Sequence, residues 1–565
     1  MGCKQVKIYP TANDSQTTTS TSKSTRKTSD IDLSSLDPNA FNSKLCQQRQ
    51  NAIDNMTYRR TIDSWTASSI QQLVNYIKEF SSNKNTVDKA WIIFYWISQN
   101  ISYDDASYFS GRIPTQATEN VFQSKKAVCE GYACLFKKLC DEIGLKCEKI
   151  SGYAKGYSYN PRKSAFDDVN HAWNVLQIDD HWYFIEATWG SGHIEKGKRF
   201  KKELDTHNFF CRPEHMIYKH LPTDNKWQLL ARPITMNEYL RLPNTHSAFF
   251  ELGLEIVTPK YSQTVHLQSG KSYAELLVKT PDDVELLGSL KDSLEGEDIE
   301  GAAQVYFDRQ KSLWICQFAP QRNGMHNITI FAKKKTSPGS FHGAIEFILD
   351  VKDLKTFNSY PHTWSHFYEY GLQIVAPNNS RSAVWPVGAS YCEILIHSPE
   401  NVLLSGDIKY DDQTIEQGNL VQYDIEKRIW QCLFAPTHTG LHKITIFAKN
   451  VKDGDVSHCA VRFDLNVNEL KQPMSFPLTY GGFQERKCKI YEPLNGILKR
   501  NTDVTFYCRI PDAKEVNLTV DSNWLVAEGY EKNVLKRTIK VGTQDVSVWT
   551  KYGNSYTGVL KYKVT

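Results

Sequence analysis

Residues 127–145 read AVCEGYACLFKKLCDEIGL, and this stretch decides the first part of the fold. Apolar residues recur at the spacing of one helix face, namely Tyr132, Leu135, Phe136, Leu139 and Ile143. Gly144 is a typical helix stop, and the helix is expected to begin at Cys129. A helix start carries unpaired N–H groups and partial positive charge, which favour a thiolate. Cys129 is therefore a candidate nucleophile, while the later cysteines of the segment are interpreted as packing residues.

The chain before this segment also shows helical spacing. One predicted helix carries Ile70, Val74, Ile77 and Phe80 on its apolar face. A second, capped by Asn85 or Thr86, carries Ala90, Phe94, Ile97 and Ile101. These patterns predict a layer of helices that precedes the Cys129 helix in the sequence.

Residues 170–190, NHAWNVLQIDDHWYFIEATWG, predict a β-hairpin. Two strand-like runs are separated by Asp179-Asp180, which is typical of a tight turn. If the turn has two residues, Ile178 faces His181, and His171 and Glu186 become diagonal neighbours within reach of each other's side chains. A three-residue turn would reverse the side-chain parity and separate them.

Cys129, His171 and Glu186 together match a nucleophile, a base and an orienting carboxylate. The imidazole would take the thiol proton and later return it to the leaving group. The carboxylate would fix the imidazole tautomer and stabilise its charged form. The alternative is an apolar cysteine and a hydrogen-bonded core histidine, which are the commoner fates of these residue types.

Four ordered segments resemble the transglutaminase-like cysteine-protease superfamily and, within it, the kyphoscoliosis peptidase and hillarin family. They are WIIFYWISQNISYD (91–104), KAVCEGYACLFKKLC (126–140), HAWNVLQIDDHWYFIEATWG (171–190) and EHMIYKHLPTDNKWQLL (214–230). The resemblance implies an α+β transglutaminase-like (papain-like) domain with Cys129 as nucleophile and His171 as base. The family's usual aspartate is Glu186 here. With the extra methylene, the carboxylate either still reaches the imidazole or overshoots it and leaves the ring poorly oriented.

Other residues near these motifs have weaker interpretations. The family implies an oxyanion partner upstream of the cysteine, for which Gln116 and Gln123 are candidates by proximity. Trp173 and Trp189 are expected to be packing residues, because indole rings bury large areas. The remaining histidines of the region show no metal-ligand spacing, and we expect them at the surface or hydrogen-bonded: His181, His193, His207, His215 and His220.

The second half of the chain repeats itself. HSAFFELGLEIVTP from His246 matches SHFYEYGLQIVAP from Ser365, and SLWICQFAP matches RIWQCLFAP. Short alternating runs between turn residues predict tandem all-β immunoglobulin-like sandwiches. Trp314 and Trp430 are expected to fill the two cores, with Cys316 and Cys432 packed beside them. Residues 472–565 keep the final hairpin but lack the F-A-P segment, and predict a shorter third sandwich.

We therefore divide the chain into five parts. They are a disordered Ser/Thr-rich leader (1–60), a transglutaminase-like cysteine protease-like domain (61–242), and sandwiches at 243–356, 357–471 and 472–565.

Charge and composition exclude several classes of protein. Hydrophobic residues make up 40% and charged residues 23% of the 565 residues, which is ordinary globular usage. The net charge of +4 originates in residues 1–60, so the folded part has no basic excess and nucleic acid is a poor partner. Thirteen cysteines without a C-x-x-C pair favour reduced thiols in the cytoplasm, and no cofactor or metal is expected.

The chain opens Met1-Gly2-Cys3, which matches a dual acylation signal except that Val6 replaces the usual Ser/Thr. A plain disordered terminus is the alternative to such a lipid anchor.

Two functions remain open. The first is a cysteine peptidase that acts on protein amide bonds through a thioacyl intermediate. The motif does not separate peptidase from transamidase, but the resemblance favours a peptidase in a cytoskeletal setting. The second is a weak or inactive protease-like scaffold (a pseudoenzyme) that binds cytoskeletal proteins, which the glutamate at position 186 motivates.

Overall fold

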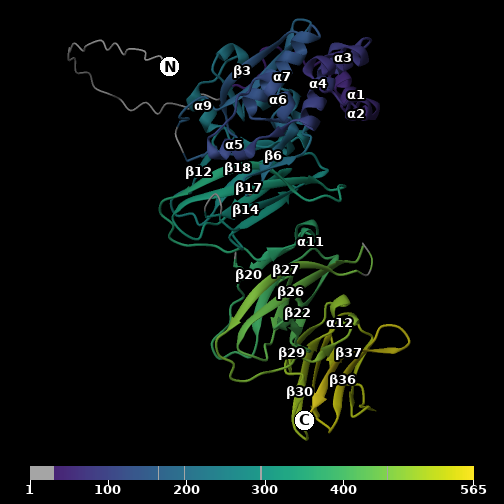
Figure 1. Cartoon of the computed structure of the whole chain (residues 1–565). Helices are drawn as coiled ribbons and strands as arrows, with labels where there is room; N and C mark the ends of the chain where they lie inside the picture. Colours follow the sequence, from purple (N-terminus) through teal and green to yellow (C-terminus); the bar gives the residue numbers. More distant parts are fainter. Residues whose placement is uncertain are drawn as a thin grey trace, which may run out of the picture.

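The computed structural model describes residues 31–162, 165–195, 197–292, 296–378, 380–452, 454 and 456–565. A mixed helix and sheet unit comes first and three β-sandwiches follow it along the chain (Figure 1). Both parts of the predicted fold class are thereby confirmed. Within the described residues, no helix combines the length and apolarity that a bilayer crossing needs. The twelve cysteines in this part of the chain are free thiols.

Residues 31–60 were expected to be disordered, and this expectation is wrong. Two helices form here, α1 (Ser43–Asp54) and α2 (Met56–Asp63). The side chains of Asn42 and Asn55 cap their first turns, and Leu45 is buried in the main core. The average composition of residues 1–60 concealed this apolar face. The Ser/Thr-rich stretch and the acylation candidates Gly2 and Cys3 lie outside the described residues.

The helical layer is built around α4 (Thr86–Asn100), which is buried on nearly all sides. Asn85, one of the two capping residues that the sequence allowed, caps it, and α3 (Ile70–Ser81) packs against it. The Cys129 helix, α7 (Cys129–Glu142), also contacts α4, and the short strand β2 leads into it. The remaining helices of the unit are α5 (Asp105–Ser110), α6 (Thr118–Ser124), α8 (Pro213–Met216) and α9 (Met236–Arg241).

One antiparallel sheet packs against α7, with the strand order β8-β5-β4-β3-β9. Its strands are β3 (Cys147–Ala154), β4 (His171–Ile178), β5 (His181–Ile185), β8 (Phe209–Cys211) and β9 (His220–Pro222). Ile178 pairs with His181, so the turn has two residues and the predicted register is confirmed. Two short pairs complete the unit: β1 (Ser102–Tyr103) with β2 (Lys126–Ala127), and β6 (Gly192–Glu195) with β7 (Arg199–Lys202).

The first sandwich packs two sheets over one apolar core. The first sheet contains β10 (Asn244–Thr245), β18 (His342–Val351), β17 (Gly324–Lys334), β14 (Val284–Lys291) and β12 (Thr264–His266). The second contains β11 (Glu255–Thr258), β13 (Ala274–Lys279), β16 (Leu313–Phe318) and β15 (Ala303–Asp308). A short helix, α10 (Ser247–Glu251), follows β10.

The second sandwich repeats this order, with α11 (Ser365–Glu369) in the place of α10. Its first sheet contains β19 (His362–Thr363), β27 (His458–Val467), β26 (Gly440–Asn450), β22 (Val402–Tyr410) and β23 (Gln413–Thr414). Its second sheet contains β20 (Gln373–Ala376), β21 (Cys392–His397), β25 (Ile429–Phe434) and β24 (Asn419–Asp424).

The third sandwich has the same order of core strands in both sheets. Its first sheet contains β28 (Leu478–Thr479), β37 (Tyr556–Val564), β36 (Asp545–Lys551), β32 (Glu515–Val520), β33 (Asn523–Trp524) and β30 (Ile497–Leu498). Its second sheet contains β29 (Lys489–Glu492), β31 (Asp503–Arg509), β35 (Val534–Lys540) and β34 (Tyr530–Glu531). Helix α12 (Gly481–Glu485) follows β28. The shortening is visible in β34, which has two residues where β15 and β24 have six.

The repeated tryptophans differ between the first two sandwiches. Trp430 is fully buried and its indole N–H donates to Ser398 Oγ. Trp314 is half-buried at the margin of its core and donates to Thr280 Oγ1. Only Trp430 therefore fills a core as predicted. Cys316 and Cys432 are fully buried, which confirms them as packing residues.

Candidate active site

Cys129 is the first residue of α7, where the sequence placed it. Its half-buried thiol points toward the strand that carries His171 and makes a long contact of 4.0 Å with the carbonyl oxygen of Asn170. The preceding amide, Val128 N, donates to Gln116 Oε1 at 3.0 Å, which fixes the entry into the helix. The local sequence thus sets the sulfur at a helix N-terminus, beside the start of β4.

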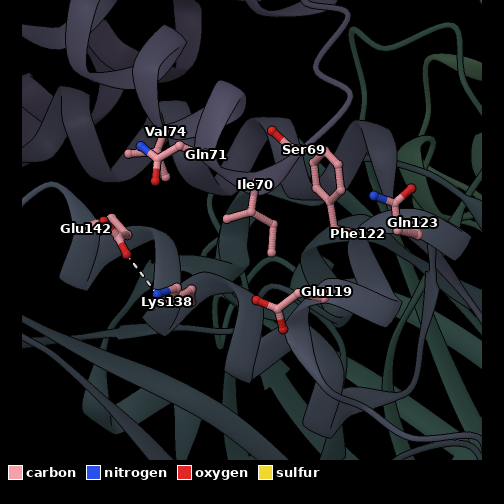
Figure 2. Close-up of a pocket in the computed structure, with 9 residues that line it drawn as sticks. All are labelled: Ser69, Ile70, Gln71, Val74, Glu119, Phe122, Gln123, Lys138 and Glu142. Carbon is pink, nitrogen blue, oxygen red and sulfur yellow. Dashed lines mark hydrogen bonds and ion pairs between the residues drawn. The ribbon is translucent and has the colours of Figure 1, made fainter.

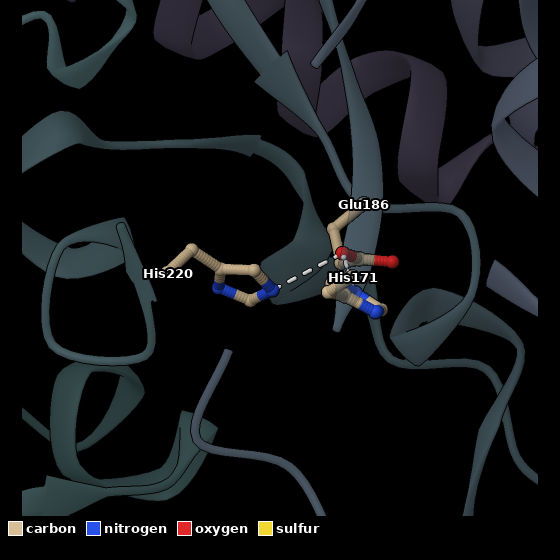
Figure 3. A group of neighbouring side chains, drawn as sticks. All are labelled: His171, Glu186 and His220. Atoms are coloured by element: carbon tan, nitrogen blue, oxygen red, sulfur yellow. Dashed lines mark hydrogen bonds and ion pairs between the residues drawn. The ribbon is translucent and has the colours of Figure 1, made fainter. Parts of the chain in front are cut away.

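His171 lies between the thiol and a carboxylate. Its Nε2 is 2.7 Å from Glu186 Oε2, and the side chain is only 8% exposed (Figure 3). Cys129 lies near the same ring and acts to raise the pKa of His171. Because Nε2 is occupied by Glu186, Nδ1 is the ring nitrogen left to serve the thiol. The structure therefore brings all three predicted residues together.

Glu186 follows β5 and is completely buried. Its Oε1 accepts the backbone N–H groups of Thr188 at 2.9 Å and Trp189 at 3.2 Å. Its Oε2 faces His171 and also His220 Nε2, at 3.1 Å. The carboxylate thus meets four donors, which matches the capacity of its two oxygens.

The pKa values of His171 and His220 are shifted in opposite directions. Burial disfavours the His171 imidazolium, but the Glu186 carboxylate and then Cys129 outweigh it and raise the pKa of His171 well above its ordinary value. Burial also acts to raise the pKa of Glu186, yet the charge and hydrogen bond of His171, joined by His220, hold it well below the ordinary value. Burial lowers the pKa of His220 to about 4 against the opposing effect of Glu186. At neutral pH the carboxylate is ionised and His220 is neutral.

His220 is the site residue that sequence reasoning missed. It was expected to be a surface or hydrogen-bonded histidine, and it is indeed hydrogen-bonded, but to the candidate site itself. It is 2% exposed and comes from β9, whose pairing with β3 sets Ala154 opposite His220. That pairing joins residues far apart in the chain, and no local spacing signals it.

Aromatic rings enclose the two imidazoles. The Trp189 ring centroid is 5.4 Å from that of His171 and 4.3 Å from that of His220. Trp173 lies 6.1 Å and 5.1 Å from the same two rings. Trp173 is fully buried, as predicted for a packing residue, whereas Trp189 is half-buried and also borders the histidines.

The two oxyanion candidates occupy different places. Gln116 lies beside the start of α7, but its amide is engaged at both ends, with Pro114 O accepting from Nε2 and Val128 N donating to Oε1. Gln123 lines a cavity of ≈ 310 Å³ between α3, α6 and α7, with Ser69, Lys138 and Glu142 (Figure 2). Cys129 is not among the residues that line this cavity. Gln116, whose amide has a second N–H beyond the one bonded to Pro114 O, is therefore the glutamine nearer to the thiol, whereas Gln123 lies in the separate cavity.

Tyr103 is a second residue that sequence reasoning passed over. It ends β1, which pairs with β2 just before Cys129. Burial, followed by the proximity of Cys129, raises the pKa of its hydroxyl strongly. Its phenol therefore stays protonated near the thiol.

The donor atoms of His171, Glu186 and His220 lie within 4.8 Å of one another, which raises the question of a metal. A tetrahedral zinc with bonds of 2.0–2.1 Å would hold neighbouring ligand atoms about 3.4 Å apart. The distances of 2.7 Å and 3.1 Å to Glu186 Oε2 are instead those of charge-assisted hydrogen bonds. Hydrogen bonding accounts for this arrangement.

The other histidines of the unit make contacts outside the site. His181 Nδ1 pairs with Asp37, and His193 faces Glu203. His207 and His215 both stack on Phe250 of α10. His181, His193 and His207 fit the expectation of surface or hydrogen-bonded histidines, whereas the His215 ring makes stacking contacts.

Comparison with known proteins places this architecture in a class. Residues 71–187 match the family model of the transglutaminase-like superfamily, and residues 236–356 and 354–478 each match that of the KY-like, immunoglobulin-like domain. The chain is therefore a transglutaminase-like protein that carries KY-like immunoglobulin-like domains.

Individual relatives define its place within that class. Mouse kyphoscoliosis peptidase is 25% identical over 518 residues, which cover 88% of this chain and 75% of the mouse protein. Drosophila melanogaster hillarin is 32% identical over 32% of this chain and 23% of its own length. Cytokinesis protein 3 of Saccharomyces cerevisiae is 25% identical over 47% of this chain and 30% of its own. The chain is a homologue of kyphoscoliosis peptidase, which confirms the resemblance found in the sequence.

Proposed function

We propose that the chain is a cysteine peptidase that cleaves protein amide bonds, with Cys129, His171 and Glu186 as its catalytic group. The observation that carries this proposal is the position of His171. Cys129 is near enough to raise the pKa of His171, while Nε2 is held by Glu186 at 2.7 Å. A thiol, an imidazole and a buried carboxylate in this order are the parts that thiol-based acyl transfer needs.

The first half of the reaction forms a thioacyl intermediate. His171 takes the thiol proton, and the Cys129 sulfur attacks the carbonyl carbon of the substrate amide. The C–N bond then breaks, and the imidazolium returns its proton to the departing amine. Glu186 keeps the ring in one orientation and stabilises its charged form throughout.

The second half decides the product. A water molecule activated by His171 attacks the thioester and releases a carboxylic acid, which completes peptide cleavage. An amine in place of water would form a new amide, which is transamidation. The name of the mammalian relatives, kyphoscoliosis peptidase, supports cleavage for this chain.

The glutamate at position 186 is the reason to consider an inactive scaffold, and its contacts favour an active enzyme. The extra methylene does not carry the carboxylate past the imidazole. The N–H groups of Thr188 and Trp189 hold Oε1, so Oε2 is presented to His171 at hydrogen-bond distance. Glu186 is one methylene longer than the usual aspartate. It can take the same role because the backbone turn that follows it holds Oε1.

The setting that best fits this activity is the cytoplasm, in association with the cytoskeleton. A yeast relative bears the name cytokinesis protein 3, which supports such a setting, and the free cysteines agree with a reducing compartment. The three sandwiches would bind protein partners or the substrate protein. Acylation of Gly2 and Cys3 would add membrane contact and is tested by the intact mass of native protein.

The experiment that tests the activity measures how fast iodoacetamide labels Cys129 between pH 5 and pH 9. An ordinary thiol reacts slowly near pH 6 because it is protonated. We expect fast labelling of Cys129 at pH 6, lost in His171→Ala and reduced in Glu186→Gln. Cys134, half-buried on the same helix, serves as an internal control, because burial followed by Glu130 raises the pKa of its thiol. Equal labelling of both cysteines at every pH would contradict the proposal.

A further inference from the structure

We propose that His220 is a positioning residue of this site: its Nε2–H holds the Glu186 carboxylate in the orientation that serves His171. This inference rests on the proposed function and goes beyond it, because it adds a fourth residue from a separate strand. Glu186 Oε2 is the shared atom, 2.7 Å from His171 Nε2 and 3.1 Å from His220 Nε2. Figure 3 shows the two imidazoles converging on it from different elements.

His220 can act here only as a donor through Nε2. An ionised carboxylate accepts hydrogen bonds and donates none, so the proton between the two groups belongs to the ring. The other nitrogen, Nδ1, is buried and has no hydrogen-bond partner. A neutral ring has a single N–H, and the structure therefore assigns it to Nε2.

The orientation of Glu186 depends on this second imidazole. The backbone N–H groups of Thr188 and Trp189 anchor Oε1 only, and a glutamate has one more side-chain torsion than an aspartate. Without His220, one buried lone pair of Oε2 would lose its donor, and His171 would be the only group left to hold Oε2. His220 thus supplies the constraint that the longer side chain requires.

The fold holds His220 in place from several sides. Trp189 and Trp173 pack against its ring, with centroid distances of 4.3 Å and 5.1 Å. Strand β9 approaches β3 closely at Gly152, where an added Cβ would lie 2.3 Å from Leu221 O. A glycine at this position therefore allows the strand to bring His220 to the carboxylate.

Several titratable groups act on this cluster and enter its pH behaviour. Besides Glu186 and His220 themselves they are Cys129, His171, Tyr103, Tyr132, Cys211 and Lys219. The proposed test compares variants that share these groups, so that a difference between their pH profiles reports the changed residue.

The test is the pH profile of Cys129 labelling by iodoacetamide in the full chain, with two variants of His220. His220→Phe keeps a ring but removes the donor, and His220→Gln restores an N–H at a similar reach. We expect His220→Phe to slow labelling at pH 6 by about tenfold or more, the usual effect of losing a hydrogen bond to a charged group, and to move the acidic limb to higher pH. We expect His220→Gln to recover most of the rate.

A matched control separates positioning from folding. His215→Phe makes the same substitution at a neighbouring histidine that stacks on Phe250, and it should label like the wild type. An unchanged profile in a folded His220→Phe variant would overturn the role of His220 while the proposed function stands. Slow labelling in the wild type itself would instead contradict the proposed function.

A measurement on the wild type covers the case in which His220→Phe does not fold. Side-chain ¹H–¹⁵N NMR of the histidines should show His220 as the neutral Nε2–H form between pH 5 and pH 7. A proton on Nδ1 in its place would leave Nε2 without a hydrogen to donate, and would overturn the inference.

Discussion

Lys219 Nζ lies 2.9 Å from Asn244 Oδ1, so the residue next to His220 is bonded to the first strand of the first sandwich. Asn244 Nδ2 in turn donates to Glu346 Oε2 on β18, at 2.6 Å. A polar chain thus links the sandwich to the strand that carries His220. We therefore expect the first sandwich to help hold β9, and with it His220, in place.

Asn244→Ala should weaken this support. The Lys219 ammonium would lose its acceptor in an environment where burial already lowers the pKa of Lys219 to about 8. We expect labelling of Cys129 at pH 6 to slow by about threefold, the lower range for effects that pass through a contact network. Asn466→Ala, on an exposed position of the second sandwich, is the control. Equal rates in both variants would show that the sandwich does not influence the site.

Glu186→Asp should reduce reactivity, although aspartate is the residue usual in the resembling family. The shorter side chain cannot hold the Thr188 and Trp189 amides with one oxygen and both imidazoles with the other. Loss of a hydrogen bond to this charged group predicts labelling about tenfold slower at pH 6. A rate at or above that of the wild type would mean that the surrounding turn adapts to either carboxylate.

Gly131→Ala should disturb the start of α7. A Cβ at this position would lie 2.5 Å from Gln116 Oε1 and 2.9 Å from Ala127 Cβ, and overpacking of this kind costs about 1–3 kcal/mol. We expect a lower melting temperature together with slower labelling of Cys129. Gly553→Ala, where a Cβ meets open space, is the matched control and should change neither quantity.

His215 should make the protein sensitive to acid. Burial, then His207 and Arg212, lowers the pKa of His215 to about 3, below the ordinary value of 6.5. The unfolded chain therefore binds a proton that the folded chain refuses between these values, and stability falls as the pH drops below 6.5.

Urea unfolding at pH 7 and pH 5 tests this pH dependence in the wild type and in His215→Phe. The variant lacks the imidazole of His215. Its free energy of unfolding relative to that of the wild type should therefore rise by about 1 kcal/mol for each pH unit below 6.5. Parallel pH dependence in the two proteins would show that His215 is protonated without penalty, and that its stacking on Phe250 does not exclude charge.

Local patterns predicted the helix and the hairpin that position the three catalytic candidates. Helical spacing placed Cys129 at the start of α7, and Asp179-Asp180 set the register that brings His171 near Glu186. Both are short-range features, in which period and turn length suffice.

Long-range packing determined what the sequence did not reveal. His220 reaches the site because β9 pairs with β3, and no spacing within the chain encodes that neighbour. The helices of residues 43–63 form because their apolar residues join the core around α4. The engagement of Gln116 at both amide ends likewise depends on the fold around Val128.

Glu186 Oε2 faces Nε2 of both His171 and His220, and this shared contact determines where the protons of the site lie. Glu186 carries one negative charge, His220 stays neutral, and one mobile proton is divided between the Cys129 sulfur and the His171 ring. Moving that proton from sulfur to nitrogen leaves the total charge of the buried group unchanged. In the proposed mechanism, the thiol–imidazole and thiolate–imidazolium forms therefore carry the same net charge, and passing between them requires no proton from solvent.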